Sequence, residues 1–247
     1  MFQFTDDLRG NLFIQMPGFY FEYKLWRELP LASKAILPVI YKHMNAWGGC
    51  YPSQQTIAIL AGITEKTARE GLKGLDGLHG FCKKKYATRR GRTSYKYTAE
   101  DIFDNQETIS ISHAFFNGGN WSQLTPSAKA VYPVLKYFKW WDFTIYREDE
   151  EISVHEGEDL SGQNYPDRKY DYAYPECEHV AEHAGVNVRS LHSAYESLSE
   201  HHFIKFHGEI EGLETWRLFT DPPKVYEPEY LNDQIAKRYV VEENFTY

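Results

Sequence analysis

Apolar residues between positions 53 and 75 recur at helical spacing, which predicts two short helices that each bury one face. Ser53 and Thr64 are residue types that begin helices as N-caps, and Gly62 is a residue type that ends a helix and allows a tight turn. The apolar positions expected to face the core are Ile57, Ala58, Ala61, Ala68, Leu72 and Leu75. The stretch is therefore expected to fold as helix, tight turn, helix.

After the second helix the pattern changes from helical spacing to alternation. The segments "GFCKKKYA" (80–87) and "TSYKYT" (93–98) alternate in the way that is typical of strands. The segment between them, "TRRGR" (88–92), holds a glycine among basic residues. These residues predict a basic β-hairpin.

A longer helix is predicted upstream, within "LPLASKAILPVIYKHMN" (29–45). The positions at helical spacing are Leu31, Ala35, Val39 and Met44. Ser33 is expected to begin this helix as its N-cap. Pro38 lies inside the helix, where a proline removes a backbone hydrogen bond at a cost of about 3 kcal/mol.

The same series of signals occurs a second time along the chain. Lys129, Ala130, Val131, Pro133 and Val134 repeat Lys34, Ala35, Ile36, Pro38 and Val39 at an offset of 95. Residues 174–198 repeat residues 51–75 at an offset of 123, and "HFIKFHG" and "LETWRLF" predict a second hairpin. The 28 extra residues lie within an acidic, aromatic stretch at about 141–173, which we expect to be a surface hairpin or long loop.

Charge divides the chain in the same way. The whole chain has a net charge of −8, but residues 20–100 hold 14 Lys and Arg against 6 Asp and Glu. Residues 101–247 hold 12 Lys and Arg against 27 Asp and Glu. Opposite charges in the two parts indicate two domains with different partners.

These patterns predict an α+β protein, mostly helical with small β-hairpins. The predicted divisions are an N-terminal arm (1–20), a basic domain (21–104), an acidic domain (105–222) that holds the insertion, and a C-terminal tail (223–247).

The segments "YPSQQTIA" and "AGITEKTAREGLKGL", followed by the basic hairpin, resemble the winged helix-turn-helix domains of bacterial, phage and plasmid regulators and replication proteins. The resemblance covers roughly residues 27–98, and a weaker one covers roughly 122–220. It implies two tandem winged helix-turn-helix domains, an architecture that is also similar to some plasmid replication initiators.

The resemblance implies that the second helix of the first domain enters the major groove of DNA. Arg69 is the best candidate to bind guanine, and Lys66 and Lys73 share its exposed face. Residues near the helix starts are candidates for phosphate contacts: Ser53, Gln54, Gln55 and Thr67. The hairpin adds Lys83, Lys84, Lys85, Arg89, Arg90 and Arg92.

The second domain carries few of these cations. Its equivalent helix presents Arg189, His192, Ser193 and Glu196, and its hairpin tip is acidic. We expect it to serve in dimerisation, in docking of a protein partner or in effector sensing, with an exposed Tyr195 as part of an interface.

Other functions find little support. Cys50, Cys82 and Cys177 are scattered, no membrane-spanning run or signal peptide is predicted, and a cytoplasmic location is expected. "HVAEH" matches a zinc-peptidase string, but its apolar residues occupy packing positions, so His179 and His183 are only a weak metal candidate.

The sequence thus predicts a DNA-binding protein without enzyme activity or cofactor, with double-stranded DNA as its partner. A transcription regulator and a phage- or plasmid-type replication initiator both fit. The alternative is a protein-interaction module whose basic hairpin meets an acidic partner. In either case no membrane partner is expected.

Overall fold

The structure is a computed structural model that describes residues 13–45, 48–87, 93–99, 108–138, 144–147, 150–153, 170–173, 175–210 and 213–219. It is an α+β fold, as predicted, in which helices and short antiparallel sheets mix.

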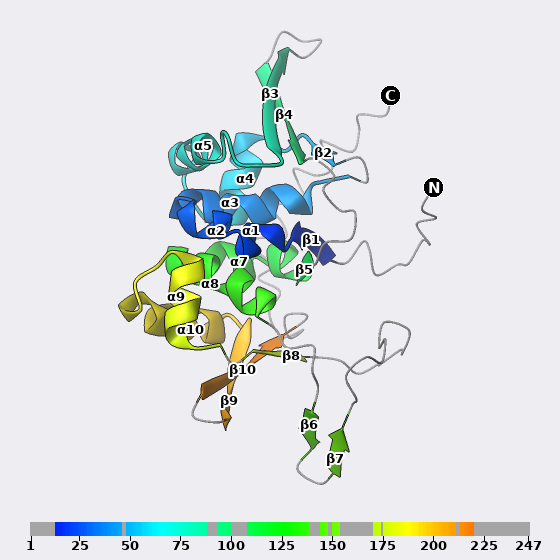
Figure 1. Ribbon diagram of the computed structural model, residues 1–247. Helices are drawn as coiled ribbons and strands as arrows, with labels where there is room; N and C mark the ends of the chain where they lie inside the picture. The colour runs from blue at the N-terminus through cyan, green and yellow to red at the C-terminus, as the bar shows by residue number, and fades with distance from the viewer. Residues whose placement is uncertain are drawn as a thin grey trace.

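The described elements form two series in the same order (Figure 1). The first series, within residues 13–99, is β1 (Phe13–Pro17), α1 (Phe19–Glu22), α2 (Leu25–Glu28), α3 (Leu31–Lys42), β2 (Gly49–Cys50), α4 (Gln54–Ala61), α5 (Glu65–Gly74), β3 (Phe81–Ala87) and β4 (Thr93–Ala99).

The second series, within residues 108–219, is β5 (Thr108–Ser112), α6 (Ala114–Asn117), α7 (Asn120–Gln123), α8 (Pro126–Tyr137), β8 (Tyr170–Ala173), α9 (Cys177–Ala184), α10 (Arg189–Glu200), β9 (Ile204–Ile210) and β10 (Leu213–Phe219). The hairpin of β6 (Thr144–Arg147) and β7 (Glu150–Ser153) lies between α8 and β8, within the stretch predicted as an insertion.

The predicted helix starts and turn at residues 53–75 are confirmed. Ser53 Oγ accepts a hydrogen bond from the backbone N–H of Thr56 (2.9 Å), and Thr64 Oγ1 accepts one from that of Thr67 (3.2 Å). Each bond satisfies an N–H group that has no partner within its own helix. Gly62 ends α4 with φ +64°, a left-handed conformation that glycine adopts without strain.

The predicted N-cap at Ser33 is wrong. Helix α3 begins at Leu31, and Pro30 is its N-cap residue. Ser33 lies inside the helix and is buried, and its hydroxyl donates a hydrogen bond to the carbonyl oxygen of Gly71 in α5 (2.8 Å). A long-range contact therefore decided the role of a residue type that favours caps locally.

The first strand of each series was the least predictable element. Strands β1 and β5 pair with each other in antiparallel register, and Gln15 lies opposite Ser110 at the centre. Thr108 and Ser110 both donate side-chain hydrogen bonds to Gln15 Oε1 (2.9 Å each). The boundary predicted at residue 20 falls inside α1 (Phe19–Glu22), and residues 13–17, within the predicted arm, form the strand that pairs with β5.

Each hairpin gains a third strand from elsewhere in the chain. The sheet orders are β2-β4-β3 in the first series and β8-β10-β9 in the second. The two predicted hairpins are confirmed, but β2 has only two residues and β8 lies at the end of the predicted insertion. Such short segments carry too little alternation to be recognised from sequence.

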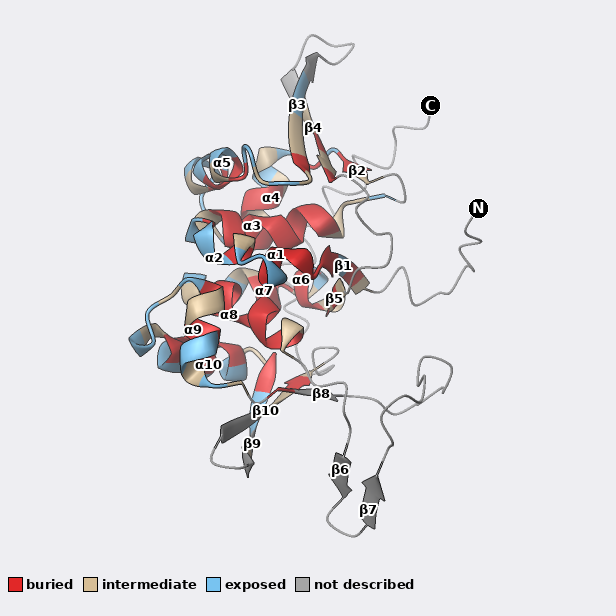
Figure 2. Cartoon of the chain, in the orientation of Figure 1, coloured by how far each residue is buried: buried red, intermediate tan, exposed pale blue. Residues whose placement is uncertain are grey.

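The two series share one hydrophobic core. Figure 2 shows buried residues running through α3, α7 and α8 at the centre, while α5 and α10 present exposed faces at the two ends. Buried apolar side chains from both series belong to one cluster, and α3 packs against α8. The hairpins β3–β4 and β9–β10 point away from this centre in opposite directions (Figure 1).

Two buried tryptophans join the series in a reciprocal way. Trp26 Nε1 donates to the carbonyl oxygen of Ala130 in α8 (2.9 Å), and Trp121 Nε1 donates to that of Ala35 in α3 (3.1 Å). Trp121 lies 95 residues after Trp26, and Ala130 lies 95 residues after Ala35. The same contact thus occurs twice, as it does across a two-fold axis.

The repeated prolines lie at these contacts. Pro38 and Pro133 are inside α3 and α8, as predicted, and each follows the accepting alanine by three residues. A proline in a helix interior interrupts the backbone hydrogen bonds of the preceding turn. The carbonyl oxygens that lose a helical partner are those of Lys34 and Lys129, four residues before each proline. The indole N–H of the opposite series donates to the next carbonyl oxygen of the same turn.

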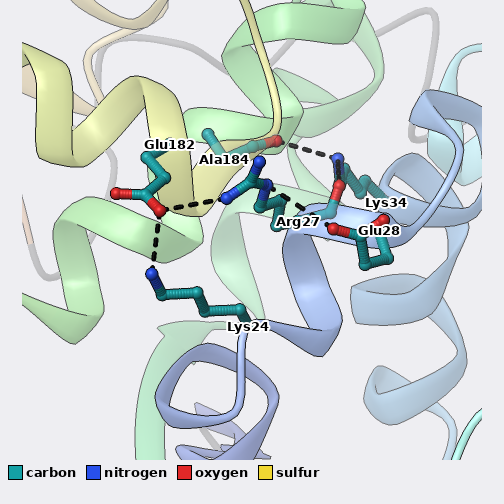
Figure 3. A network of polar contacts seen from close by, with 6 residues as sticks. All are labelled: Lys24, Arg27, Glu28, Lys34, Glu182 and Ala184. Carbon is teal, nitrogen blue, oxygen red and sulfur yellow. Dashed lines mark hydrogen bonds and ion pairs between the residues drawn. The ribbon is translucent and has the colours of Figure 1, made fainter.

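Polar contacts also join the series, as Figure 3 shows. Glu182 of α9 accepts hydrogen bonds from Lys24, the N-cap residue of α2 (2.8 Å), and from Arg27 within α2 (3.0 Å). The hydrogen-bonded ammonium of Lys24 lowers the pKa of the Glu182 carboxyl. Lys34 is buried, and its Nζ donates to the carbonyl oxygens of Arg27 (3.0 Å) and Ala184 (2.8 Å). These bonds hold the end of α9 against the first series.

Candidate nucleic-acid interface

Helix α5 has one buried and one exposed face. Ala68 and Leu72 are buried in the shared core, as the helical spacing predicts. Lys66, Arg69 and Lys73 are exposed, and this too was predicted from the helical spacing. The three cations therefore lie together on the solvent side of one helix.

The cations of this face are accompanied by two acids, Glu65 and Glu70, which are exposed as well. The Arg69 side chain lies along the helix, and its Nε donates to the carbonyl oxygen of Glu65 (3.3 Å). Such an exposed, weak contact is readily exchanged for a base edge or a phosphate. The face is thus basic, but by a small margin, and the hairpin beside it supplies most of the positive charge.

The predicted phosphate contacts at the helix starts have local partners. Ser53 Oγ, which accepts the capping bond of α4, also lies 2.7 Å from Thr56 Oγ1. Thr64 Oγ1, which accepts the capping bond of α5 from the backbone N–H of Thr67, also lies 2.9 Å from Thr67 Oγ1. Gln54 is half-buried at the start of α4, and Gln55 is exposed there. The hydroxyl groups therefore hold the two helix starts in shape, and backbone N–H groups at these starts favour an anion.

The register of the hairpin divides its lysines between two faces. Lys84 lies opposite Lys96 on one face, while Lys83 and Lys85 lie opposite Tyr97 and Tyr95 on the other. Lys84 and Lys85 are exposed, whereas Lys83 is half-buried. Successive side chains of a strand point to opposite faces, so every second residue shares a face. The register of the hairpin therefore fixes which lysines lie together.

The lysines of the hairpin differ in their contacts. Lys83 Nζ lies 3.8 Å from a carboxylate oxygen of Asp76 and 5.6 Å from the ring centre of Tyr95. Lys96 Nζ lies 5.8 Å from the ring centre of the exposed Tyr51. The alternation of the strands indicates Lys96 as a member of the surface. The place of Tyr51, which follows β2, and the contacts of Lys83 depend on the tertiary fold.

Three predicted site residues, Arg89, Arg90 and Arg92, lie outside the described residues. The described lysines nevertheless place positive charge along the hairpin up to Lys85. Figure 1 shows α5 and the β3–β4 hairpin at the same end of the molecule. Helix and hairpin together can therefore meet one extended polyanion.

The corresponding surface of the second series has other chemistry. Arg189, His192 and Glu196 occupy the places of Lys66, Arg69 and Lys73 at an offset of 123, and all three are exposed. His192 Nε2 lies 3.2 Å from a carboxylate oxygen of Glu196. The position of Lys83 is taken by Phe206, which is half-exposed.

The prediction that Tyr195 is exposed is wrong. Its ring is buried and lies against that of Trp216 in β10, with 4.6 Å between ring centres. Tyr195 occupies the place of Leu72, so it belongs to the inner face of α10. The helical spacing could have shown this, because Leu191, Tyr195 and Leu198 recur at steps of four and three.

The two histidines of "HVAEH" have partners within the fold. His183 Nδ1 lies 2.9 Å from the carbonyl oxygen of His179, and the His183 ring packs edge-on against Phe138. Val180, Ala181 and Ala184 of the same helix are buried, as predicted. In the described part of the chain, no group of three or more His, Cys, Asp and Glu residues is placed to hold a metal ion.

Comparison with known protein families matches the segment of the chain that contains α4 and α5. Residues 27–78 match a family model described as a helix-turn-helix domain. The match runs from α2 through α5 and ends before β3, so it includes Lys66, Arg69 and Lys73. The chain therefore contains a helix-turn-helix domain, and this class of domain indicates a DNA-binding protein.

A comparison with curated proteins gives no match. Among the helices that the structure describes, none has both the length and the apolar character needed to cross a bilayer.

Proposed function

We propose that this protein consists of two tandem winged helix-turn-helix units, of which the first binds double-stranded DNA. The exposed cations of α5, within the matched helix-turn-helix domain and beside the basic β3–β4 hairpin, carry the proposal. In this arrangement α5 lies in the major groove, where Arg69 binds a base edge. Lys84 and Lys85 of the hairpin bind phosphates.

The second unit serves assembly or regulation and not strong DNA binding. Its α10 pairs a histidine with Glu196 at the positions that hold Arg69 and Lys73 in α5. Phosphates repel a carboxylate, so this face adds little attraction to DNA. Its partner is a protein or a second copy of the chain.

The protein acts without catalysis or cofactor, in the cytoplasm, as a transcription regulator or a phage- or plasmid-type replication initiator. Both need a protein that binds a defined DNA sequence, and the location of the bound sites separates them. Sites at promoters favour a regulator, and sites at an origin favour an initiator. Sequencing of genomic fragments protected by the protein gives that location.

The proposal is tested by measuring affinity for random-sequence duplex DNA at several salt concentrations. We expect affinity to fall steeply with salt, because bound lysines displace counterions from the phosphates. Lys84→Ala should reduce the logarithmic salt slope by about 1, since one phosphate contact contributes about 0.9. Lys66→Ala should weaken binding several-fold, to roughly the extent expected for one lost phosphate or base contact.

Arg189→Ala is the matched control, because Arg189 occupies in α10 the place of Lys66 in α5. It should leave affinity unchanged. Loss of affinity from Arg189→Ala equal to that from Lys66→Ala would contradict the division between the units. Absence of any duplex binding at low salt would reject DNA binding and favour the protein-interaction alternative.

A further inference from the structure

Helix α5 approaches α3 closely at its two glycines, Gly71 and Gly74. A Cβ atom at Gly71 would lie 2.8 Å from the carbonyl oxygen of Ala32, and one at Gly74 would overlap the Ser33 hydroxyl. Any side chain at either position would push the two helices apart. Gly71 is also buried on the face of α5 that points away from Arg69, since helical residues advance by about 100° each.

A buried hydrogen bond fixes this contact. Ser33 Oγ of α3 donates to the carbonyl oxygen of Gly71 (2.8 Å), and Ser33 is fully buried. A directional bond at the point of closest approach limits how far α5 can slide or rotate on α3. The glycines set the distance between α5 and α3, and the serine sets the position of α5 along α3.

The second series is built differently at the same place. Ala128 and Ala194 stand where Ser33 and Gly71 stand in the first series, and Ser197 takes the place of Gly74. The Ser197 hydroxyl accepts a hydrogen bond from the backbone N–H of Thr125, the N-cap residue of α8 (3.2 Å). This bond lies at the start of α8, whereas Ser33 donates from within α3. Helices α8 and α10 therefore pack without a serine–glycine contact. That contact occurs in the first series, where the exposed face of α5 is basic.

We infer that Ser33, together with Gly71 and Gly74, is a positioning site that sets the sequence specificity of α5. The inference rests on the proposed function. Hydrogen bonds to base edges need a side chain placed to within about 0.5 Å, whereas attraction to phosphates tolerates displacement. Loosening α5 on α3 should therefore cost discrimination between DNA sequences before it costs attraction to DNA.

The experiment compares Ser33→Ala with Ser197→Ala in the full chain. The probes are a duplex selected by the wild-type chain from a randomised pool and a duplex with the same bases in scrambled order. Ser33→Ala should bind the selected duplex about tenfold more weakly, the size of one lost base contact, and the scrambled duplex within about twofold of wild type. Ser197→Ala also removes a buried hydroxyl, but at α10, and should leave the ratio of the two affinities unchanged.

Gly71→Ala provides an independent variant if Ser33→Ala does not fold, as judged by circular dichroism. It keeps the hydroxyl and displaces α5 by steric contact, so the same loss of discrimination is expected. The positioning role is rejected if Ser33→Ala and Gly71→Ala keep the wild-type ratio, or if Ser197→Ala lowers it equally. Failure of the wild-type chain to select any sequence would instead reject the proposed function itself.

Discussion

Lys34 and Lys129 show how far the surroundings of a residue can depart from its sequence preference. Both lysines are buried, and both ammonium groups donate to main-chain oxygens. Lys129 Nζ binds the carbonyl oxygens of Leu124 (2.7 Å) and Ser122 (3.3 Å), within its own series. Burial lowers the pKa of each lysine to about 8, because a charged amine loses its hydration there.

This lowered pKa predicts a pH dependence of stability. Between about pH 8 and the unfolded pKa of about 10.4, the unfolded chain binds more protons than the folded one at Lys34. Stability contributed by Lys34 therefore rises with pH across this window and is constant below it. The free energy of unfolding of wild type minus that of Lys34→Met, from urea titrations at several pH values, should increase over the window.

Lys84→Met removes an exposed lysine and is the control for this comparison. A difference between wild type and Lys34→Met that stays constant or falls from pH 8 to 10 would contradict the assigned burial of the amine.

At the scale of elements, the turns after α4 and α9 combine a local and a long-range requirement. Gly62 and Gly185 have φ values of +64° and +61°, which the sequence pattern anticipates for residues that end helices. A Cβ atom at Gly62 would also overlap the carbonyl oxygen of Ser122, and one at Gly185 that of Arg27. Each turn is thus pressed against the other series, a contact that local pattern cannot indicate.

Alanine substitution separates these two requirements. Gly77 has φ +86° and no atom within 4 Å of an added Cβ, so Gly77→Ala should cost only the left-handed strain, about 1 to 2 kcal/mol. Gly62→Ala and Gly185→Ala add a steric conflict of about 1 to 3 kcal/mol, so each should lose clearly more. Thermal or urea unfolding measures the three variants, and equal losses would show that the turns do not need the close contact.

For the whole molecule, the reciprocal tryptophan bonds and the shared core make the two series one folding unit. Trp26 and Trp121 each donate a hydrogen bond to a helix of the other series. Strand β1 of the first series also pairs with β5 of the second. Neither series can bury its apolar face without the other, so unfolding should be a single cooperative transition.

Trp26→Phe and Trp121→Phe test this coupling as an equivalent pair. Each change removes one indole donor and leaves a buried carbonyl with fewer partners, at an expected cost of about 1 to 3 kcal/mol. Both variants should unfold in one transition that coincides by circular dichroism and by fluorescence. Two separate transitions, or a loss confined to the series that carries the change, would show that the series fold independently.

The sequence by itself determined the local elements: the capped helices at residues 54–61 and 65–74, the hairpins, the repeated prolines and the basic face of α5. These features depend on side-chain spacing and on bonds between residues a few positions apart, which a pattern records directly. The sequence therefore indicated the exposed Lys66, Arg69 and Lys73 as candidate contacts with DNA.

The tertiary structure alone decided which distant surfaces meet. It placed Ser33 against Gly71, buried Lys34 beside the end of α9, paired β1 with β5, and gave Lys83 a carboxylate and an aromatic neighbour. Each of these contacts joins segments whose proximity depends on how both series pack, and side-chain spacing within one segment carries no information on that packing.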